Sequence, residues 1–125
     1  MLGTSDAMAT IAVRNIDAAK SFYEGKLGLT QVQTGEPGVL MFRTGTSSVL
    51  VYESQYAGTN KATAATWVVG EDIRALVQAL KAKGVGFEHY DLPGTTRDGD
   101  VHVAGTLSVA WCKDPDGNIL SFVSR

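Results

Sequence analysis

The stretch of sequence that decides the fold runs from Ile11 to Gly28 and reads IAVRNIDAAKSFYEGKLG. Its β-branched start predicts a strand, and Asn15 then stands where a side chain accepts hydrogen bonds from the first turn of a helix. Apolar residues follow at helical spacing until Gly28 ends the pattern. They are Ile16, Ala19, Phe22, Tyr23 and Leu27. The stretch therefore predicts a short strand followed by an amphipathic helix.

The second half of the chain repeats this pattern. Asp72 takes the capping position after an apolar run, and Gly84 ends the second helix. The apolar face between them consists of Ile73, Leu76, Val77 and Leu80. Ile16 corresponds to Ile73 at an offset of 57 residues, and Gly28 to Gly84 at an offset of 56. We infer a duplicated unit with a slip of one residue between its copies.

Each helix is followed by three strand-like segments, separated by turn-forming residues such as DPDGN at 114–118. These segments are 30–34, 39–44, 49–53, 86–90, 107–112 and 119–124. The linker at 55–64 is expected to form a mobile flap. Because neither half buries a core alone, we predict an α+β fold in which two βαβββ modules, about 6–54 and 63–125, form one domain over residues 1–125.

Three segments also carry a family resemblance. They are 13–23 running into LGL at 27–29, then LKAKGV at 80–85, and above all DPDGNIL at 114–120. In this order, and with the duplication, the chain resembles the vicinal oxygen chelate superfamily, which includes glyoxalase I, bleomycin resistance proteins and extradiol dioxygenases. The resemblance implies a glyoxalase/bleomycin resistance-like fold, in which two modules form a cup-shaped mixed sheet that a second subunit often completes. A dimeric ferredoxin-like α/β barrel, the alternative, explains neither the second module nor the DPDGN turn.

The resemblance also places four metal-ligand positions on the inward face of the cup. They fall on Met8, Val51, Ser121 and Ala65, or on Ala64 if the one-residue slip precedes the second helix. None of these side chains supplies the carboxylate or imidazole groups that a divalent cation needs. We therefore expect no metal and no cofactor at the inherited site.

The cup is expected to be apolar with few polar groups. Because strand side chains alternate between faces, positions two residues from the inherited ligands share their face. Those positions are Thr10, Val49, Glu53, Trp67, Ile119 and Val123. Trp67 is the expected stacking wall for a ligand, and Glu53 is the expected polar contact at the edge. His102 joins them because its loop, 91–105, could fold over the cup. The predicted ligand-binding residues are Trp67, Glu53, Thr10, Met8, Val51, Ser121 and His102.

Two alternatives concern chemistry outside the inherited site. Asp98, Asp100 and His102 stand at alternate positions, which on an extended segment would gather three potential metal ligands on one face. Proton transfer by Glu53, His102 or Tyr90 would instead support a metal-free enzyme. The chain contains no Gly-x-Ser-x-Gly elbow and no glycine-rich phosphate fingerprint.

The function that these observations favour is binding without chemistry. We expect a metal-independent protein that encloses a small apolar or amphipathic ligand, resembling the bleomycin resistance proteins that sequester a drug. The alternative is a glyoxalase-like lyase or isomerase, or a dioxygenase-related enzyme, that uses relocated ligands or metal-free acid and base residues. A regulatory interaction module is a third alternative, although no helix pattern indicates an exposed apolar face for a partner.

Composition and charge narrow the partners. The 125 residues include 11 basic and 13 acidic side chains, a net charge of −2, with no basic stripe for nucleic acid. No uncharged apolar window of about 18 residues would cross a membrane. Cys112 is the single cysteine, which fits a reducing compartment, so we expect a cytoplasmic protein. Half-open cups expose sheet edges that a symmetric copy covers, and we therefore expect a homodimer.

Overall fold

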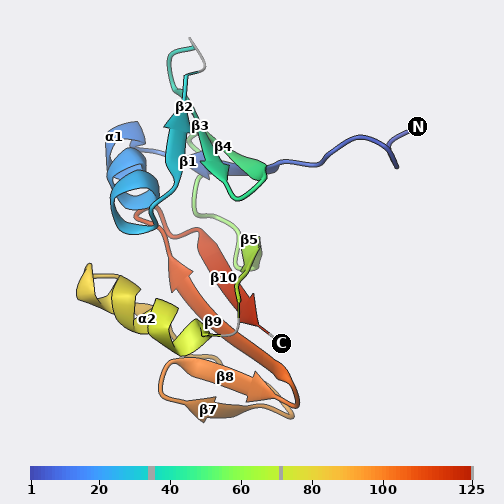
Figure 1. Cartoon of the computed structure of the whole chain (residues 1–125). Helices are drawn as coiled ribbons and strands as arrows, with labels where there is room; N and C mark the ends of the chain where they lie inside the picture. Colours follow the sequence, from blue (N-terminus) through green and yellow to red (C-terminus); the bar gives the residue numbers. More distant parts are fainter. Residues whose placement is uncertain (34–35, 71, 125) are drawn as a thin grey trace.

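The computed structural model describes residues 1–33, 36–70 and 72–124, and it contains two β-sheets (Figure 1). The strands of the first sheet are β1 (Ala9–Val13), β2 (Thr30–Val32), β3 (Val39–Thr44) and β4 (Ser47–Glu53). They lie in the order β1-β4-β3-β2, with β1 parallel to β4 and the other neighbours antiparallel. Along the chain, one strand, a helical segment and three strands follow one another, which is the predicted βαβββ succession.

The second sheet repeats the first and adds a hairpin at its edge. Its strands are β5 (Thr63–Val68), β6 (Phe87–Glu88), β7 (Thr96–Asp98), β8 (Val101–Ala104), β9 (Leu107–Lys113) and β10 (Ile119–Ser124). They lie in the order β5-β10-β9-β8-β7, and β6 also pairs with β9. β5 is parallel to β10, as β1 is to β4. The sequence predicted a loop where the β7–β8 hairpin lies, because strands this short show no recognisable period.

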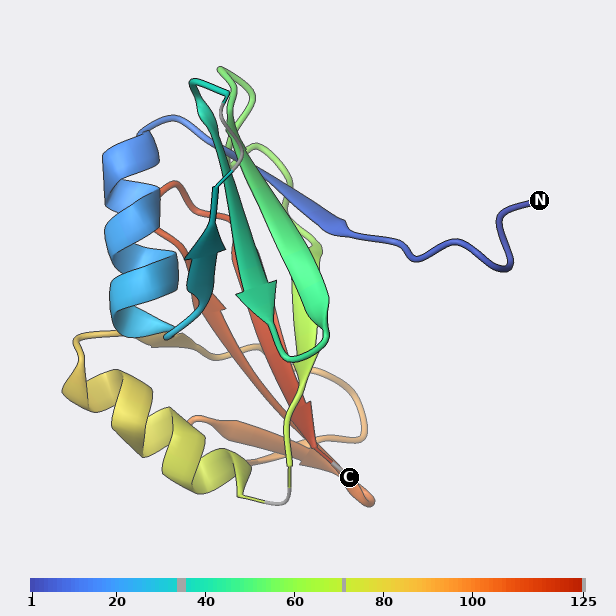
Figure 2. The same ribbon diagram turned by 45° about the horizontal axis from the view of Figure 1, so that its top comes forward.

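Two helical segments cover the same side of the sheets (Figure 2). α1 (Ile16–Lys20) continues directly into the π-helical turns of η1 (Ser21–Lys26), and α2 spans Ile73–Ala82. The N-terminal segment leaves from the other side, which carries no helix (Figure 2). None of the helices in the described part of the chain is long and apolar enough to span a membrane.

The helix ends follow the predicted capping residues. The side-chain oxygen of Asn15 accepts a hydrogen bond from the Ala18 N–H at 3.0 Å, and Asp72 accepts one from the Ala75 N–H at 2.9 Å. Each cap satisfies a backbone donor that the first helical turn leaves unpaired. Gly84, one residue past the C-cap of α2, has a φ of 88°, a left-handed conformation that glycine adopts without strain.

The apolar core lies between the helical segments and the covered side of each sheet. The ring of Tyr23 in η1 lies 5.9 Å from that of Phe42 on β3, and α2 buries Val77 and Leu80. The buried strand residues on this side include Ile11, Val13, Val51, Cys112, Leu120 and Phe122. The alternate positions of the same strands therefore face the helix-free side.

The Asp-Pro-Asp-Gly-Asn turn ties the second module to the first. The carboxylate of Asp114 is buried and accepts from the N–H groups of Asp116 and Asn118 at 3.0 and 2.8 Å. Its other oxygen accepts from the hydroxyl of Tyr23 at 2.8 Å. The Asn118 side-chain amide donates to the carbonyl of Ala12 at 2.7 Å. The turn thus bonds to both β1 and η1 of the first module.

The linker between the modules packs on this turn. Ala57 is 2% exposed, and a Cβ built on Gly58 would overlap the carbonyl oxygen of Asp116. Only glycine allows this approach, since the φ of Gly58 is also positive at 70°. The middle of the linker therefore lies against the turn.

The remaining strand predictions differ mainly in length. The segments 39–44 and 119–124 coincide with β3 and β10, whereas the segment 86–90 is reduced to the two residues of β6. β2 ends at Val32, and the predicted end at Thr34 lies outside the described residues.

Candidate ligand-binding site

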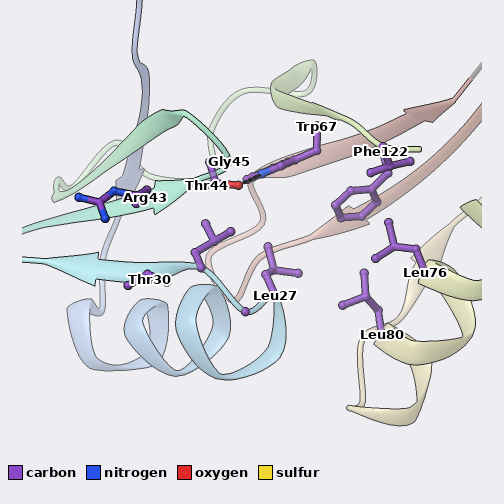
Figure 3. Close-up of a pocket in the computed structure, with 12 residues that line it drawn as sticks. Leu27, Thr30, Arg43, Thr44, Gly45, Trp67, Leu76, Leu80 and Phe122 are labelled. Carbon is purple, nitrogen blue, oxygen red and sulfur yellow. Dashed lines mark hydrogen bonds between the residues drawn. The ribbon is translucent and has the colours of Figure 1, made fainter. Parts of the chain in front are cut away.

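A cavity of about 340 Å³ opens between the two modules on the side that the helices cover (Figure 3). The segment between η1 and β2, the start of β2 and the end of β3 contribute from the first module, and β5, α2 and β10 from the second. Its apolar lining consists of Leu27, Leu29, Trp67, Val69, Leu76, Leu80 and Phe122. The cavity therefore requires both modules, and its walls are mostly hydrocarbon and aromatic.

Trp67 forms one wall of this cavity. Its indole N–H donates to the hydroxyl of Thr44 at 3.0 Å, which fixes the ring across the gap between β5 and the end of β3. The indole lies 5.9 Å from the ring of Phe122, its neighbour across the parallel β5–β10 pair. The hydrogen bond joins the modules and leaves the faces of the ring free for packing.

The polar side chains that line the cavity come from the first module. Arg43 and Thr30 lie on the side of β2 and β3, whereas Phe122 and Leu76 lie at the opposite end beside α2 (Figure 3). The Arg43 residue is exposed to solvent. Its guanidinium points away from Trp67 and Phe122, so the arginine lies at the mouth of the cavity (Figure 3). An apolar chamber with a cation at its mouth suits an amphipathic molecule whose negative group stays at the opening.

Two of the predicted ligand-binding residues, Val51 and Ser121, do not lie on the side of the sheet that the sequence predicted for them. Val51 is fully buried in the core under α1, because β4 turns its odd-numbered residues toward the helix. Ala65 shares the helix-covered side with Trp67, whereas Ser121 faces the other side. The predicted pairing of Trp67 with Ser121 on one face is therefore wrong, because the register of β5 against β10 sets Trp67 beside Phe122.

Of the four positions expected to correspond to metal ligands, Ser121 lies on the helix-free side, whereas Val51 and Ala65 lie on the helix-covered side. The strand registers pair Thr10 with Leu50 in the first sheet, and Thr66 with Ser121 in the second. The hydroxyls of Thr66 and Ser121 share a hydrogen bond of 2.6 Å. None of the four is a carboxylate or an imidazole, and the described residues contain no group of three or more His, Cys, Asp or Glu side chains placed to hold a metal ion. These side chains do not supply the ionised oxygens or neutral imidazole nitrogens that bind a divalent cation in proteins.

Three further predicted residues lie away from the Trp67 cavity. Met8 precedes β1 and is 40% exposed, and Thr10 is exposed with its hydroxyl 3.4 Å from the Met8 carbonyl. Glu53 ends β4 and lines a shallow hollow together with Arg14. Among the described residues of the predicted set, Trp67 alone lines the cavity between the modules.

The acidic residues near His102 are held apart by α2. Asp98 pairs with Arg74 at 2.8 Å, and Asp100 pairs with Lys81 at 2.8 Å and with His89 at 2.7 Å. These hydrogen bonds lower the pKa of Asp100 below its ordinary value. His102 is buried on the helix-free side and lines a separate cavity with Tyr90. The three residues of the alternative metal site therefore do not converge, because a turn separates β7 from β8.

Sequence reasoning missed most of the residues that enclose the cavity. Arg43 and Thr44 end β3, Leu27 and Leu29 follow η1, and α2 supplies two further leucines. These groups meet only when the modules pack. One signal was available: a Trp on the first strand of a module and a Phe on its last strand become neighbours in a parallel pair. Trp67 and Phe122 form such a pair.

Comparisons with known proteins agree with this architecture. The glyoxalase family protein from Enterococcus faecalis superposes with a TM-score of 0.73 at 20% identity, over 98% of this chain and 99% of that one. A fosfomycin resistance protein from Listeria monocytogenes gives 0.74 at 10% identity, over 98% and 93% of the chains. Lactoylglutathione lyase from Agrobacterium tumefaciens gives 0.67 at 18% identity, over 98% and 95%. At these identities the likeness establishes the fold and no activity.

No curated protein matches the chain. The family model described as Glyoxalase/Bleomycin resistance protein/Dioxygenase superfamily matches residues 7–122. The duplicated βαβββ modules and the solved structures of the same fold agree with that match. The chain therefore belongs to this superfamily, the vicinal oxygen chelate proteins.

Proposed function

We propose that the protein binds a small amphipathic molecule in the cavity beside Trp67, without a metal and without converting it. The observation that carries this proposal is the cavity itself, about 340 Å³, with Trp67 and Phe122 in its wall and Arg43 at its mouth. Ligand pockets in proteins typically measure about 300 to 1,000 Å³ and are mostly apolar with few polar groups. The ligand's apolar part packs on Trp67 and Phe122, and its anionic group faces Arg43.

The metal-independent part of this proposal rests on the donor set of the helix-free side. Thr66 and Ser121 hydrogen bond to each other, and Leu50 is aliphatic, so no ionised ligand is available at these positions. Binding of this kind resembles sequestration by bleomycin resistance proteins. The cationic Arg43 nevertheless favours an anionic ligand over a cationic drug, because like charges repel at the mouth of the cavity.

We further propose that two copies associate through the helix-free side. This side and its margins expose Val68 at 86%, Met8 at 40% and Tyr52 at 38%. A symmetric partner would cover this apolar surface. A wild-type dimer at micromolar concentration that Val68→Glu converts to a monomer in sedimentation would support association, and a monomeric wild type would contradict it. A cytoplasmic location, proposed from the single thiol of Cys112, is tested by cell fractionation.

The binding proposal is tested with two fluorescent probes of similar shape. Anilinonaphthalene sulfonate is an amphipathic anion, and N-phenylnaphthylamine is its uncharged analogue. Both should bind the wild-type protein, because both present an aromatic body to Trp67. Arg43→Gln should weaken binding of the anionic probe about tenfold, the size expected for losing one charged contact. The same variant should bind the neutral probe as tightly as the wild type does. Trp67→Ala should weaken both probes.

The matched control is Arg14→Gln, an exposed arginine outside the cavity. It should bind both probes as the wild type does. Circular dichroism of each variant establishes that it is folded. Binding of both probes that is unchanged in Arg43→Gln and in Trp67→Ala would contradict the proposal, and so would the absence of binding to the wild-type protein.

A further inference from the structure

A second cavity, of about 580 Å³, lies beside the β7–β8 hairpin and is separate from the Trp67 cavity. Tyr90, Leu92 and Pro93 line it from the segment before β7. Arg97 lines it from β7 and His102 from β8. We propose that this cavity binds a small organic carboxylate, held by the His102 ring N–H, the Tyr90 hydroxyl and the Arg97 guanidinium.

The protonation of His102 follows from its hydrogen bond. The backbone N–H of Tyr90 donates to Nε2 of His102 at 3.0 Å, so Nε2 is the acceptor and the proton of the neutral ring is on Nδ1. His102 is only 3% exposed, and its Nδ1 has no hydrogen-bond partner within the described part of the chain. A buried donor without a partner is unfavourable, and a ligand oxygen would remove this deficit.

The hydroxyl of Tyr90 is a second donor of the same kind. Its oxygen is buried and has no partner among the described residues. Burial, followed by the nearby carboxylate of Glu88, raises the pKa of Tyr90, so the phenol keeps its proton and donates at neutral pH. The edge of Trp111 supports both rings, with centroids 5.1 Å from Tyr90 and 4.8 Å from His102. Two unpaired donors are therefore held in place by one aromatic cluster.

Arg97 supplies the charge that selects an anion. Arg97 and His102 are directly opposite each other in the antiparallel β7–β8 pair, and both line the cavity. Directly opposed side chains on one face of such a pair have Cβ atoms about 5 Å apart. A guanidinium and an imidazole N–H at this spacing match the two oxygens of a carboxylate, which accept from separate donors.

The neighbouring acidic groups do not cancel this charge. Asp98 is paired with Arg74, and Asp100 is paired with Lys81 and His89, so both carboxylates are engaged on the α2 side. Asp91 also lines the cavity but is exposed, where water screens its charge. Leu92 and Pro93 give the cavity an apolar wall for the carbon skeleton. The combination favours a carboxylic acid with an apolar body over a phosphate or a sugar.

The proposal is tested with Trp111 as the reporter. Trp67→Phe leaves Trp111 as the single tryptophan, and its contacts with Tyr90 and His102 make its emission sensitive to this cavity. The probes are acetate, hexanoate, benzoate and phenylpropionate, each compared with its primary amide. At least one carboxylate should change the emission saturably and bind about tenfold more tightly than its amide, since the amide lacks the charge.

Two conservative variants connect the binding to the proposed donors. Arg97→Gln should lower the affinity for the carboxylate about tenfold. Tyr90→Phe should also lower this affinity, while it keeps the ring that Trp111 supports. Arg14→Gln is the matched control and should bind as the parent does. In a nitrogen-15 spectrum of His102, the carboxylate should shift the Nδ1 resonance.

Three results would overturn the proposal: no saturable change with any carboxylate, equal binding of the amides, or undiminished binding in both Arg97→Gln and Tyr90→Phe. These results would leave the binding of the naphthalene probes unaffected, because those probes report on the cavity between the modules. Failure at one cavity is thus distinguishable from failure at the other.

Discussion

The hydroxyl of Tyr23 donates a hydrogen bond of 2.8 Å to the carboxylate of Asp114, although 91 positions separate the two residues in sequence. Tyr23 belongs to the first module and Asp114 to the turn before the last strand of the second. Both side chains are buried, at 0% and 4% exposure. The two modules are therefore joined by a specific polar contact as well as by apolar packing.

Removing the hydroxyl of this pair should weaken the fold without disturbing its packing. Tyr23→Phe keeps the ring beside Phe42 and leaves Asp114 with its bonds from the turn. We expect the free energy of unfolding in urea to fall by about 1 to 2 kcal/mol, the usual effect of deleting one buried hydrogen bond to a charged group. Tyr56→Phe, at an exposed tyrosine, should change it little. Equal stabilities of the two variants would contradict this role.

The same pair should make the fold sensitive to alkaline pH. Burial, followed by the charge of Asp114, raises the pKa of the Tyr23 phenol above its ordinary value of 10.0. A raised pKa means that the stabilisation is complete below the ordinary pKa and is lost as the pH rises above it. Urea unfolding between about pH 8 and about pH 11 should therefore show a steeper loss for the wild type than for Tyr23→Phe. Parallel curves would contradict the assignment.

Cys112 should be chemically silent in the folded protein. Its side chain is fully buried, and burial, with the nearby charge of Asp114, raises the pKa of its thiol to about 12. Because the thiolate is the reactive form, iodoacetamide at about pH 8 should label Cys112 only after unfolding in urea. Mass spectrometry gives the extent of labelling. Rapid labelling of the native protein, at the rate found in urea, would show that β9 is not packed as described.

Gly58 should tolerate substitution worse than other glycines with a positive φ. An alanine there would strain the backbone and would also overlap the carbonyl of Asp116. We expect Gly58→Ala to lower the free energy of unfolding by about 3 kcal/mol. Gly105→Ala, with a φ of 60° and no atom within 4 Å of the new Cβ, should lower it by about 1 kcal/mol, from backbone strain alone. A larger loss in Gly105→Ala would contradict the close contact of the linker with the turn.

The metal-independent proposal predicts the response to chelation. Protein purified without chelator should contain Zn, Ni, Mn and Fe at well below one ion per chain. Dialysis against a chelator should leave both the unfolding midpoint and the binding of the naphthalene probes unchanged, because neither depends on an ion. A stoichiometric ion that His102→Ala abolishes would contradict the proposal and would favour relocated ligands.

Much of the fold follows from local signals in the sequence. The structure contains the predicted helix caps at Asn15 and Asp72, the predicted strands 39–44 and 119–124, and the duplication. These features were predictable because helix caps and the spacing of apolar residues depend on near neighbours in the sequence. The β7–β8 hairpin was missed, since β8 forms through pairing with β9, and β7 through pairing with β8, rather than from patterns of their own. The packing of the linker on Asp116 depends on contacts between distant segments and has no local signal.

The site was less predictable than the fold. Trp67 was predicted as a ligand wall, and it does line a cavity, although on the side opposite to Ser121. A register error of one residue moves every side chain of a strand to the other face, which is why Val51 was expected to face a ligand although it is buried in the core. Arg43 was missed because its role depends on the docking of two modules.

The most direct test of the account is a crystal structure of the protein with bound anilinonaphthalene sulfonate. We predict electron density for the probe in the cavity between the modules, with its rings against Trp67 and Phe122 and its sulfonate toward Arg43. Density for the probe at another place on the chain, with that cavity filled by protein side chains, would contradict the central claim.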